Sequence, residues 1–318
     1  MVLSKIAFLY PGQGSQKVGM GKELLETVPE LFVQYMARSN RVAGIPVTQY
    51  CLEGPLEMLS QTNVAQPALF AHSLALTDYA CRLGILPDMV AGHSLGEYTA
   101  AVAAGALTFE DGLYLVSQRG KLMYQIQDEQ PGAMAAIVGL DMETLRMLCA
   151  EISKRHLVTV TNWNTYTQFV VSGEEAGVLA LMTAVSAYQN VRAIRLAVRG
   201  AFHSILMAPV QKALISAMGT VTWYDLQVPL VANVSGEVLH KKQEILHELT
   251  SQITSPVQWV SCVETLLAAG CDTFVEIGAS QVLTRLVRSI APTSRTFAVD
   301  TPEKIVALAA TLNRSVYV

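Results

Sequence analysis

Residues 88–106 of this 318-residue chain place a Gly-rich pentapeptide between an apolar strand pattern and an Ala-rich helix pattern. The pentapeptide is Gly92-His93-Ser94-Leu95-Gly96, which matches G-x-S-x-G. In the order strand, sharp turn and helix, this motif lifts a serine hydroxyl clear of a sheet and points a helix N-terminus at it. The sequence therefore predicts an α/β fold in which Ser94 is a candidate nucleophile. The alternative is a chance match in a Gly-containing turn.

Strand and helix patterns alternate through both outer parts of the chain. Residues 6–10 form a short apolar run that ends in the turn at residues 11–14, and residues 67–83, 97–106 and 108–124 have helical patterns. Thr108 and Asp111 have the spacing of a helix cap. Hydrophobic residues make up 51% of the chain and charged residues 15%, which is enough apolar material for a large core. Such alternation is typical of an α/β domain with a mainly parallel sheet.

The middle of the chain has a different rhythm. Strand patterns occur at residues 133–138, 157–162, 168–172 and 191–197, and helical patterns at residues 142–155 and 174–187. Their order is β-α-β-β-α-β, which is the order of a ferredoxin-like unit. We therefore expect residues 129–197 to be an inserted ferredoxin-like subdomain. Residues 1–128 and 198–318 would together form the catalytic α/β domain.

A serine nucleophile needs a base, and the chain has six histidines. His203 is favoured because it follows the nucleophile in the chain and lies at a loop-to-helix junction. His93 adjoins the serine, and its side chain cannot easily turn back onto it. Asp272 and Glu276 lie near a strand end, but nothing in the sequence selects either as a third member. A backbone carbonyl could orient the imidazole instead, because that role needs an acceptor and not a charge.

Arg119 lies within the helical pattern of residues 108–124 in an unusual setting. The residues three and four positions before and after it are all apolar, so the spacing puts its side chain in a core-facing stripe. Lys121, with polar residues or tyrosine at the same offsets, belongs to the solvent face. A buried guanidinium needs a partner. Two interpretations are open: an internal salt bridge, or a bidentate clamp for a substrate carboxylate.

Several function classes are not supported by the composition and motifs. The net charge is −4, without the basic surplus expected of a nucleic-acid binder. There is no phosphate-binding G-x-x-x-x-G-K-[ST] loop, no dinucleotide fingerprint, and no CxxC pair among the five cysteines. The N-terminal apolar stretch is too short for a signal peptide, and no apolar run approaches a membrane span. We expect a cytoplasmic protein with no metal, no nucleic acid and no membrane partner.

Taken together, the motifs resemble the malonyl-CoA:acyl carrier protein transacylase family. The matching stretches follow the family order over nearly the whole chain: residues 8–16 (FLYPGQGSQ), 62–67 (TNVAQP), 92–98 (GHSLGEY), 118–120 (QRG), 200–204 (GAFHS), 256–259 (PVQW) and 274–278 (FVEIG). The resemblance implies an α/β-hydrolase-like core with a ferredoxin-like insert. The sequence departs from the family pattern at residues 278–280 and 163–166, which concerns loop detail and not the chemistry.

The resemblance also implies roles for individual residues. Ser94 would be acylated and His203 would be its base, oriented by the backbone carbonyl of Gln258. The backbone N–H groups of Gln13 and Leu95 would form the oxyanion hole. In the substrate-binding site, Arg119 would hold the malonyl carboxylate, together with Phe202 and His93. The sequence from Ala201 to His203 is similar to the version associated with malonyl rather than methylmalonyl selection.

The expected function is transfer of malonyl from malonyl-CoA to the phosphopantetheine thiol of an acyl carrier protein. Malonyl-CoA is then a substrate, and no further cofactor is expected. The chain looks most like the free-standing acyltransferases of polyketide synthases, with the fatty acid synthesis enzyme as the alternative. Two other functions stay open: a hydrolase that clears acyl groups from carrier proteins, and a non-catalytic docking module. A hydrolase acting on neutral acyl chains would have no use for the buried Arg119.

Overall fold

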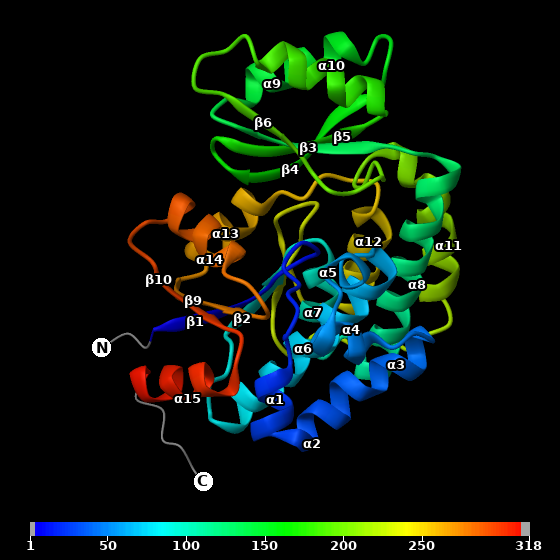
Figure 1. Cartoon of the computed structure of the whole chain (residues 1–318). Helices are drawn as coiled ribbons and strands as arrows, with labels where there is room; N and C mark the ends of the chain where they lie inside the picture. The colour runs from blue at the N-terminus through cyan, green and yellow to red at the C-terminus, as the bar shows by residue number, and fades with distance from the viewer. Residues whose placement is uncertain (1–3, 313–318) are drawn as a thin grey trace.

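The computed structural model describes residues 4–312, which contain two separate β-sheets. The larger sheet has six strands in the order β10-β9-β1-β2-β7-β8, and its helices surround it in the lower part of Figure 1. Its strands are β1 (Lys5–Tyr10), β2 (Met89–Gly92), β7 (Leu230–Val231), β8 (Val238–Leu239), β9 (Cys271–Ile277) and β10 (Arg295–Val299). Every pairing is parallel except that of β7 with β8, which confirms the mainly parallel sheet.

The core of the larger sheet explains why its strands are apolar throughout. The last five residues of β1 and all four residues of β2 are buried, as expected for parallel strands covered on both faces. Helices on the two faces include α6 (Thr62–Arg82), α7 (Leu95–Ala103), α8 (Phe109–Glu129), α13 (Trp259–Ala268) and α14 (Val282–Ile290). Further helices of this part of the molecule pack mostly against other helices. They are α1 (Lys22–Thr27), α2 (Pro29–Leu31), a π-helical stretch (Phe32–Ala37), α3 (Arg38–Ala43), α4 (Val47–Glu53), α5 (Leu56–Leu59) and α15 (Pro302–Thr311).

Two helix starts test the sequence-based boundaries. The start of α8 is as predicted: Thr108 is its N-cap, and the N–H of Asp111 donates to Thr108 Oγ1 over 3.1 Å. The start of α6 is not, because the helix begins at Thr62 and Pro67 lies inside it. A proline in a helix removes one backbone hydrogen bond. The additional turn buries Thr62, Val64, Ala65 and Gln66, and this burial outweighs the lost bond.

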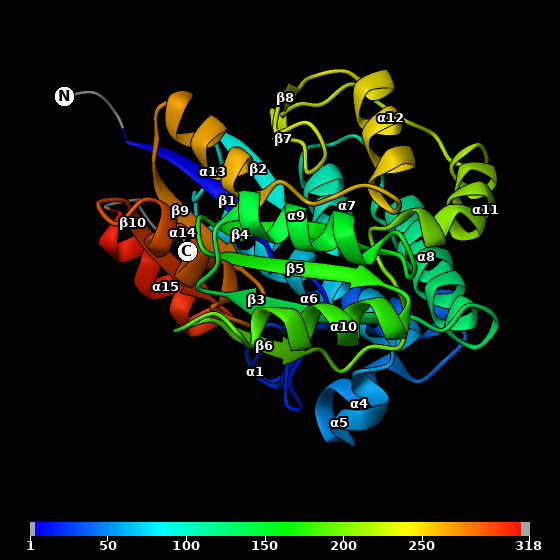
Figure 2. The ribbon, with the colours of Figure 1, turned by 90° about the horizontal axis from the view of Figure 1, so that it is seen from above.

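The second sheet is antiparallel and lies above the first in Figure 1. Its strand order is β4-β5-β3-β6, with β3 (Ala133–Val138), β4 (Val158–Thr165), β5 (Gln168–Gly173) and β6 (Arg192–Arg195). Figure 2 shows α9 (Met142–Ile152) and α10 (Glu175–Val185) lying together over one face of this sheet. The chain order is the predicted β-α-β-β-α-β. We propose that residues 129–197 form an inserted subdomain, because these elements bury a hydrophobic cluster of their own.

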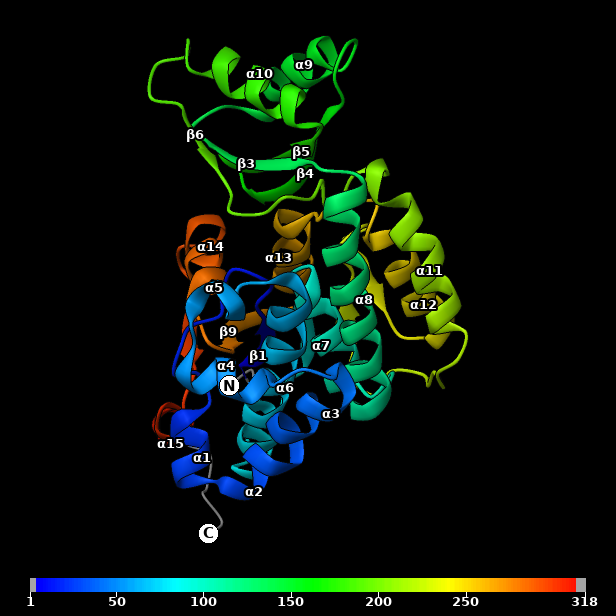
Figure 3. The ribbon, with the colours of Figure 1, turned by 45° about the vertical axis from the view of Figure 1, so that its right-hand side comes forward.

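The two sheets are connected by more than the chain crossings. The segment before α13 pairs with β4: the N–H of Trp163 donates to the carbonyl of Val257, and the N–H of Val257 to the carbonyl of Thr161, each over 2.9 Å. A further helical pair, α11 (Ala208–Met218) and α12 (Lys242–Gln252), completes one side of the molecule. Figure 3 shows α8 beside α11, and α11 beside α12. Within residues 4–312, no helix is long and apolar enough to cross a membrane.

Candidate active site

The turn that carries Ser94 is backbone-strained, and its flanking glycines are required by close packing. Ser94 has a φ of 53° and a ψ of −104°, a region that residues with a side chain rarely adopt. A Cβ on Gly92 would lie 1.9 Å from the carbonyl oxygen of Gly96, and one on Gly96 would lie 1.9 Å from that of Tyr10. Strand β2, the turn and α7 therefore meet without room for a methyl group, which is the physical reason for both glycines of the motif.

This close packing leads to a stability prediction. Gly96→Ala should lower the free energy of unfolding by about 2–3 kcal/mol, because the new methyl group must push β1 and α7 apart. Gly219→Ala is a matched control: Gly219 has a φ of −70°, and its nearest neighbour to a new Cβ lies at 3.5 Å. It should unfold within about 1 kcal/mol of the wild-type protein. Urea denaturation checks this, and equal midpoints for the two variants would contradict it.

Ser94 and His203 are in direct contact in the folded chain. Ser94 Oγ lies 2.7 Å from His203 Nε2, and His203 Nδ1 lies 2.9 Å from the backbone carbonyl of Gln252. A carbonyl can only accept, so Nδ1 carries the proton and Nε2 is free to receive the proton of the serine. His203 also has a positive φ, 60°. Burial, and then the charge of Arg119, lower the pKa of His203 to about 3, so the imidazole is neutral near pH 7.

The residue that orients His203 corrects the sequence prediction, which named Gln258. The carbonyl of Gln258 accepts from the N–H of Cys262 in the first turn of α13, whereas His203 Nδ1 is hydrogen-bonded to the carbonyl of Gln252. Gln252 is the last residue of α12, and four residues later stands Pro256, which has no N–H. The Gln252 carbonyl therefore receives no helical bond from residue 256. It accepts from the N–H of Ser255 over 3.3 Å, and its second lone pair accepts from the imidazole. In this structure the acceptor is a backbone carbonyl, that of Gln252 and not that of Gln258.

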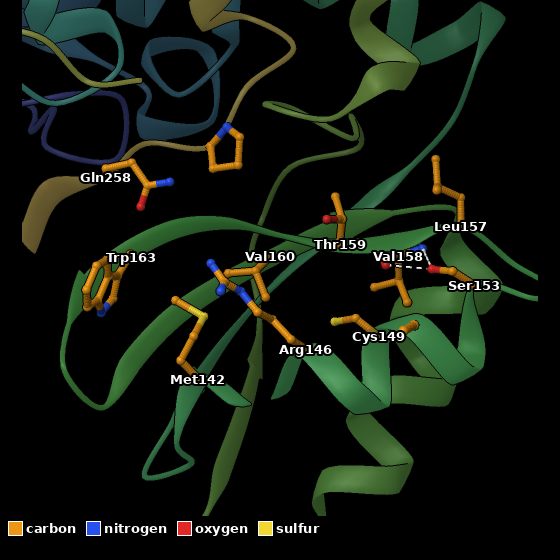
Figure 4. Close-up of a pocket in the computed structure, with 12 residues that line it drawn as sticks. Met142, Arg146, Cys149, Ser153, Leu157, Val158, Thr159, Val160, Trp163 and Gln258 are labelled. Atoms are coloured by element: carbon orange, nitrogen blue, oxygen red, sulfur yellow. Dashed lines mark hydrogen bonds between the residues drawn. The ribbon is translucent and has the colours of Figure 1, made fainter. Parts of the chain in front are cut away.

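Gln258 instead lies in the wall of a second cavity, of about 380 Å³, away from Ser94 and His203. Figure 4 shows this cavity between α9 and β4 on one side and the segment of Pro256 to Gln258 on the other. Arg146, Cys149 and Trp163 line it. None of the predicted catalytic residues contributes to its wall.

Arg119 is buried beside Ser94 with uncharged partners only. Its side chain is 1% exposed. One terminal nitrogen donates to Gln66 Oε1 over 2.9 Å, and the other lies 3.1 Å from both Ser94 Oγ and Gln252 Oε1. The guanidinium also lies over the ring of Tyr98, 5.4 Å from its centroid. Among the described residues, no carboxylate forms a salt bridge with Arg119, so the structure does not support the internal salt bridge.

The two backbone groups predicted for the oxyanion hole come from different parts of the chain. Leu95 is the first residue of α7, so its N–H has no partner within the helix. Gln13 lies in the turn after β1, which is held against the Ser94 turn because the N–H of His93 donates to the carbonyl of Tyr10 over 2.9 Å. Gln13 and Ser94 line the same cavity.

This main cavity has a volume of about 430 Å³ and lies between the two sheets. Ser94, His203 and Arg119 line it, and Met134, Val170 and Phe202 add apolar walls. His93 also lines it, with Nε2 2.9 Å from Asn164 Oδ1 on β4; burial lowers the pKa of His93, so this imidazole is neutral too. Within residues 4–312, no group of three or more His, Cys, Asp or Glu side chains is placed to hold a metal ion.

Sequence reasoning missed several polar residues that hold this site together. Gln66, Gln252 and Asn233 are fully buried. Asn233 Oδ1 accepts from the N–H of Ser94 over 2.8 Å, and its amide donates to the carbonyl of Gly92 over 2.6 Å. The only sequence signals were the polarity of Gln66 within a mostly apolar helix and the position of Pro256 after Gln252.

Comparison with known proteins agrees with this geometry. Residues 7–312 match the acyl transferase domain model. Malonyl CoA-acyl carrier protein transacylase of Bacillus subtilis is 41% identical over 304 residues, covering 95% of this chain and 96% of that protein. The crystal structure of malonyl-CoA:acyl carrier protein transacylase from Xanthomonas oryzae has a TM-score of 0.92 and 35% identity, and covers 98% of this chain and 99% of its own.

A further solved structure contains a carrier protein. It is a type II polyketide synthase acyl-carrier protein in complex with its malonyl-transacylase, which has a TM-score of 0.92 and 34% identity and covers 97% of this chain and 100% of its own. The residues matched by the family model, 7–312, include Ser94 and His203. The chain belongs to the acyl transferase domain family and, within it, to the malonyl-CoA:acyl carrier protein transacylases.

Proposed function

We propose that this protein transfers malonyl from malonyl-CoA to the phosphopantetheine thiol of an acyl carrier protein, through an ester on Ser94. The observation that carries the proposal is the position of Ser94 Oγ, 2.7 Å from the neutral His203 Nε2 and 3.1 Å from the buried guanidinium of Arg119. An activated serine makes an acyl-enzyme. A buried cation without an anionic partner favours an acyl group that brings a carboxylate.

In the first half-reaction, Ser94 Oγ attacks the thioester carbon of malonyl-CoA, and its proton passes to His203 Nε2. The negative charge that develops on the thioester oxygen is stabilised by the N–H groups of Leu95 and Gln13. The carbon–sulfur bond then breaks, and the coenzyme A thiol leaves with the proton from His203. The carbonyl of Gln252 stabilises the transient imidazolium and keeps its ring in place.

In the second half-reaction, the carrier protein thiol replaces the coenzyme A thiol. Its sulfur attacks the ester carbon while His203 accepts the thiol proton. The bond to Ser94 Oγ then breaks, and Ser94 recovers a proton from His203. Arg119 holds the malonyl carboxylate through both steps, while Phe202 and His93 form the cavity walls beside it.

The hydrolase function differs only in the second step, where water replaces the thiol. Arg119 argues against a hydrolase for neutral acyl chains, and the relatives that match are transacylases by name. The carrier protein belongs to either polyketide or fatty acid biosynthesis. The absence of any cofactor and the cytoplasmic location stay predictions from the sequence.

The fate of the acyl-enzyme tests this proposal. Incubation with malonyl-CoA should add one malonyl group, at Ser94, and release coenzyme A before any carrier protein is present. The ester should survive in buffer far longer than with a carrier protein bearing phosphopantetheine, because transfer requires that water is kept from the ester. Intact-protein mass spectrometry and peptide mapping measure both. Rapid loss as free malonate without carrier protein would support the hydrolase.

A further inference from the structure

A buried acidic residue lies directly under the Ser94 turn and has no part in the proposed mechanism. Glu97, the third residue of α7, is 0% exposed, and its carboxyl group lies beside that of Glu248 on α12, which is 6% exposed. Burial, and then the neighbouring Glu248, raise the pKa of Glu97 well above its usual value. Two adjacent buried carboxyl groups cannot both ionise, so Glu97 carries a proton that it donates to Glu248.

Glu97 accepts hydrogen bonds from the two residues that fix the site. Its Oε1 accepts from the N–H of Asn233 over 2.7 Å, and its Oε2 accepts from the side-chain amide of Gln252 over 2.5 Å. The same amide nitrogen of Gln252 donates to the carbonyl of Ser94 over 2.8 Å, and Asn233 binds the N–H of Ser94. Both residues therefore connect Glu97 to the turn of the nucleophile.

Gln252 also carries this connection to Arg119. With its amide nitrogen held by Glu97 and by the Ser94 carbonyl, its Oε1 must point at Arg119, 3.1 Å away. Without Glu97, the amide of Gln252 could rotate, and the guanidinium would lose one of its acceptors. The backbone carbonyl that holds His203 is fixed separately, by the end of α12.

We propose that Glu97 is a positioning residue that sets acyl selectivity, because it fixes the Gln252 side chain that aims Arg119 at the substrate carboxylate. This inference rests on the proposed malonyl transfer. The other titratable and charged groups facing the pair are Arg119 from α8, Tyr98 from α7, Cys262 from α13 and His247 from α12.

The hydrogen-bond pattern explains why a carboxylic acid stands here. A protonated carboxyl group accepts at both oxygens and donates once, which satisfies Asn233, Gln252 and Glu248 together. A glutamine at position 97 has one acceptor oxygen, so it can satisfy Asn233 or Gln252 but not both. A glutamine at position 248 can still accept from the N–H of Val234, which Glu248 does over 2.7 Å, and donate to an ionised Glu97. Glu97→Gln should therefore disturb Gln252, and Glu248→Gln much less.

The test compares acylation by malonyl-CoA and acetyl-CoA in matched variants. Glu97→Gln should lower kcat/KM for malonyl-CoA by about 10- to 100-fold and that for acetyl-CoA by less than about threefold, because one buried hydrogen bond to the cation's partner is lost. Gln252→Leu removes the amide but keeps the backbone carbonyl, so it should give the same loss of selectivity. Glu248→Gln should keep the malonyl preference to within about threefold.

Glu276→Gln controls for loss of a buried glutamate as such. Glu276 is 0% exposed and accepts from the N–H of Thr284 and from Ser280 Oγ, outside the site. This variant should melt at a lower temperature with an unchanged malonyl-to-acetyl ratio. Equal losses for both substrates in Glu97→Gln, or no change in Gln252→Leu, would overturn the inference while leaving malonyl transfer intact. Failure of the wild-type protein to accept malonyl would instead reject the proposed function.

Discussion

Arg119→Ala is expected to lower kcat/KM for malonyl-CoA by about two to three orders of magnitude. The kcat/KM for acetyl-CoA should stay unchanged or rise. The guanidinium is 1% exposed, and its hydrogen-bond partners are the neutral Gln66, Gln252 and Ser94. The malonyl carboxylate would supply the anionic partner that Arg119 lacks. Removing one partner of a buried ion pair costs about 3–5 kcal/mol, and about 1.4 kcal/mol corresponds to a tenfold change in rate. Acetyl has no carboxylate and loses nothing, so the preference should invert.

The control for this prediction is on the same helix. Lys121→Ala removes a cation that is exposed on α8, so it should leave kcat/KM for both substrates unchanged. Both substrates must be measured on wild type and both variants, with a melting curve for each. If malonyl and acetyl rates fall together in Arg119→Ala, this arginine stabilises the fold and does not select the substrate.

His203→Ala is expected to slow acylation of Ser94 by about 10²- to 10⁴-fold, because a positioned general base contributes that much. The base would act directly on Ser94 Oγ, which is 2.7 Å from Nε2. Ser94→Ala is the negative control, because this variant lacks the nucleophile and should carry no malonyl label. His240→Ala removes an exposed histidine and should behave as wild type. A near-normal rate in His203→Ala would show that another group is the base.

The pH dependence of acylation tests the same residue in the intact protein. An imidazole with a pKa near 6.5 would be mostly protonated at pH 5, and the rate would fall about thirtyfold from its value at pH 7.5. Burial and the charge of Arg119 lower the pKa of His203 to about 3, so the base stays neutral through this range. We expect less than a twofold change in kcat/KM between pH 5 and 7.5, with circular dichroism to confirm that the protein stays folded. A tenfold fall in kcat/KM at pH 5 would contradict the lowered pKa of His203.

Most of the fold could be predicted because it depends on local patterns. The apolar runs of β1 and β2, the helix cap at Thr108 and the β-α-β-β-α-β order of residues 133–195 are all features of short segments. The prediction failed where burial outweighed a local rule, as at Pro67, which lies inside α6 rather than at its start. A single residue type cannot reveal how much surface its neighbours bury.

The sequence by itself also identified Ser94 as the candidate nucleophile and predicted that Arg119 is buried. Motif context and helix spacing are local features, so both can be read without knowledge of the tertiary structure. The carbonyl that accepts from His203 could not be predicted from local sequence. Gln252 and Gln258 lie only six positions apart, and their carbonyls differ in the groups that they bind in the folded chain. Only the folded chain shows that the Gln252 carbonyl, which lacks a helical bond from Pro256 at the end of α12, points at the imidazole of His203.

The remaining polar network was decided by the tertiary structure alone. Glu97, Asn233 and Gln252 come from segments up to 155 residues apart. Nothing in their local sequence distinguishes them from surface residues of the same type. They meet because α7 and α12 pack under the same turn, where buried polar groups must find partners in one another. Ser94 could therefore be predicted from its neighbours in sequence, whereas the residues that fix its geometry depend on contacts that form only when the chain folds.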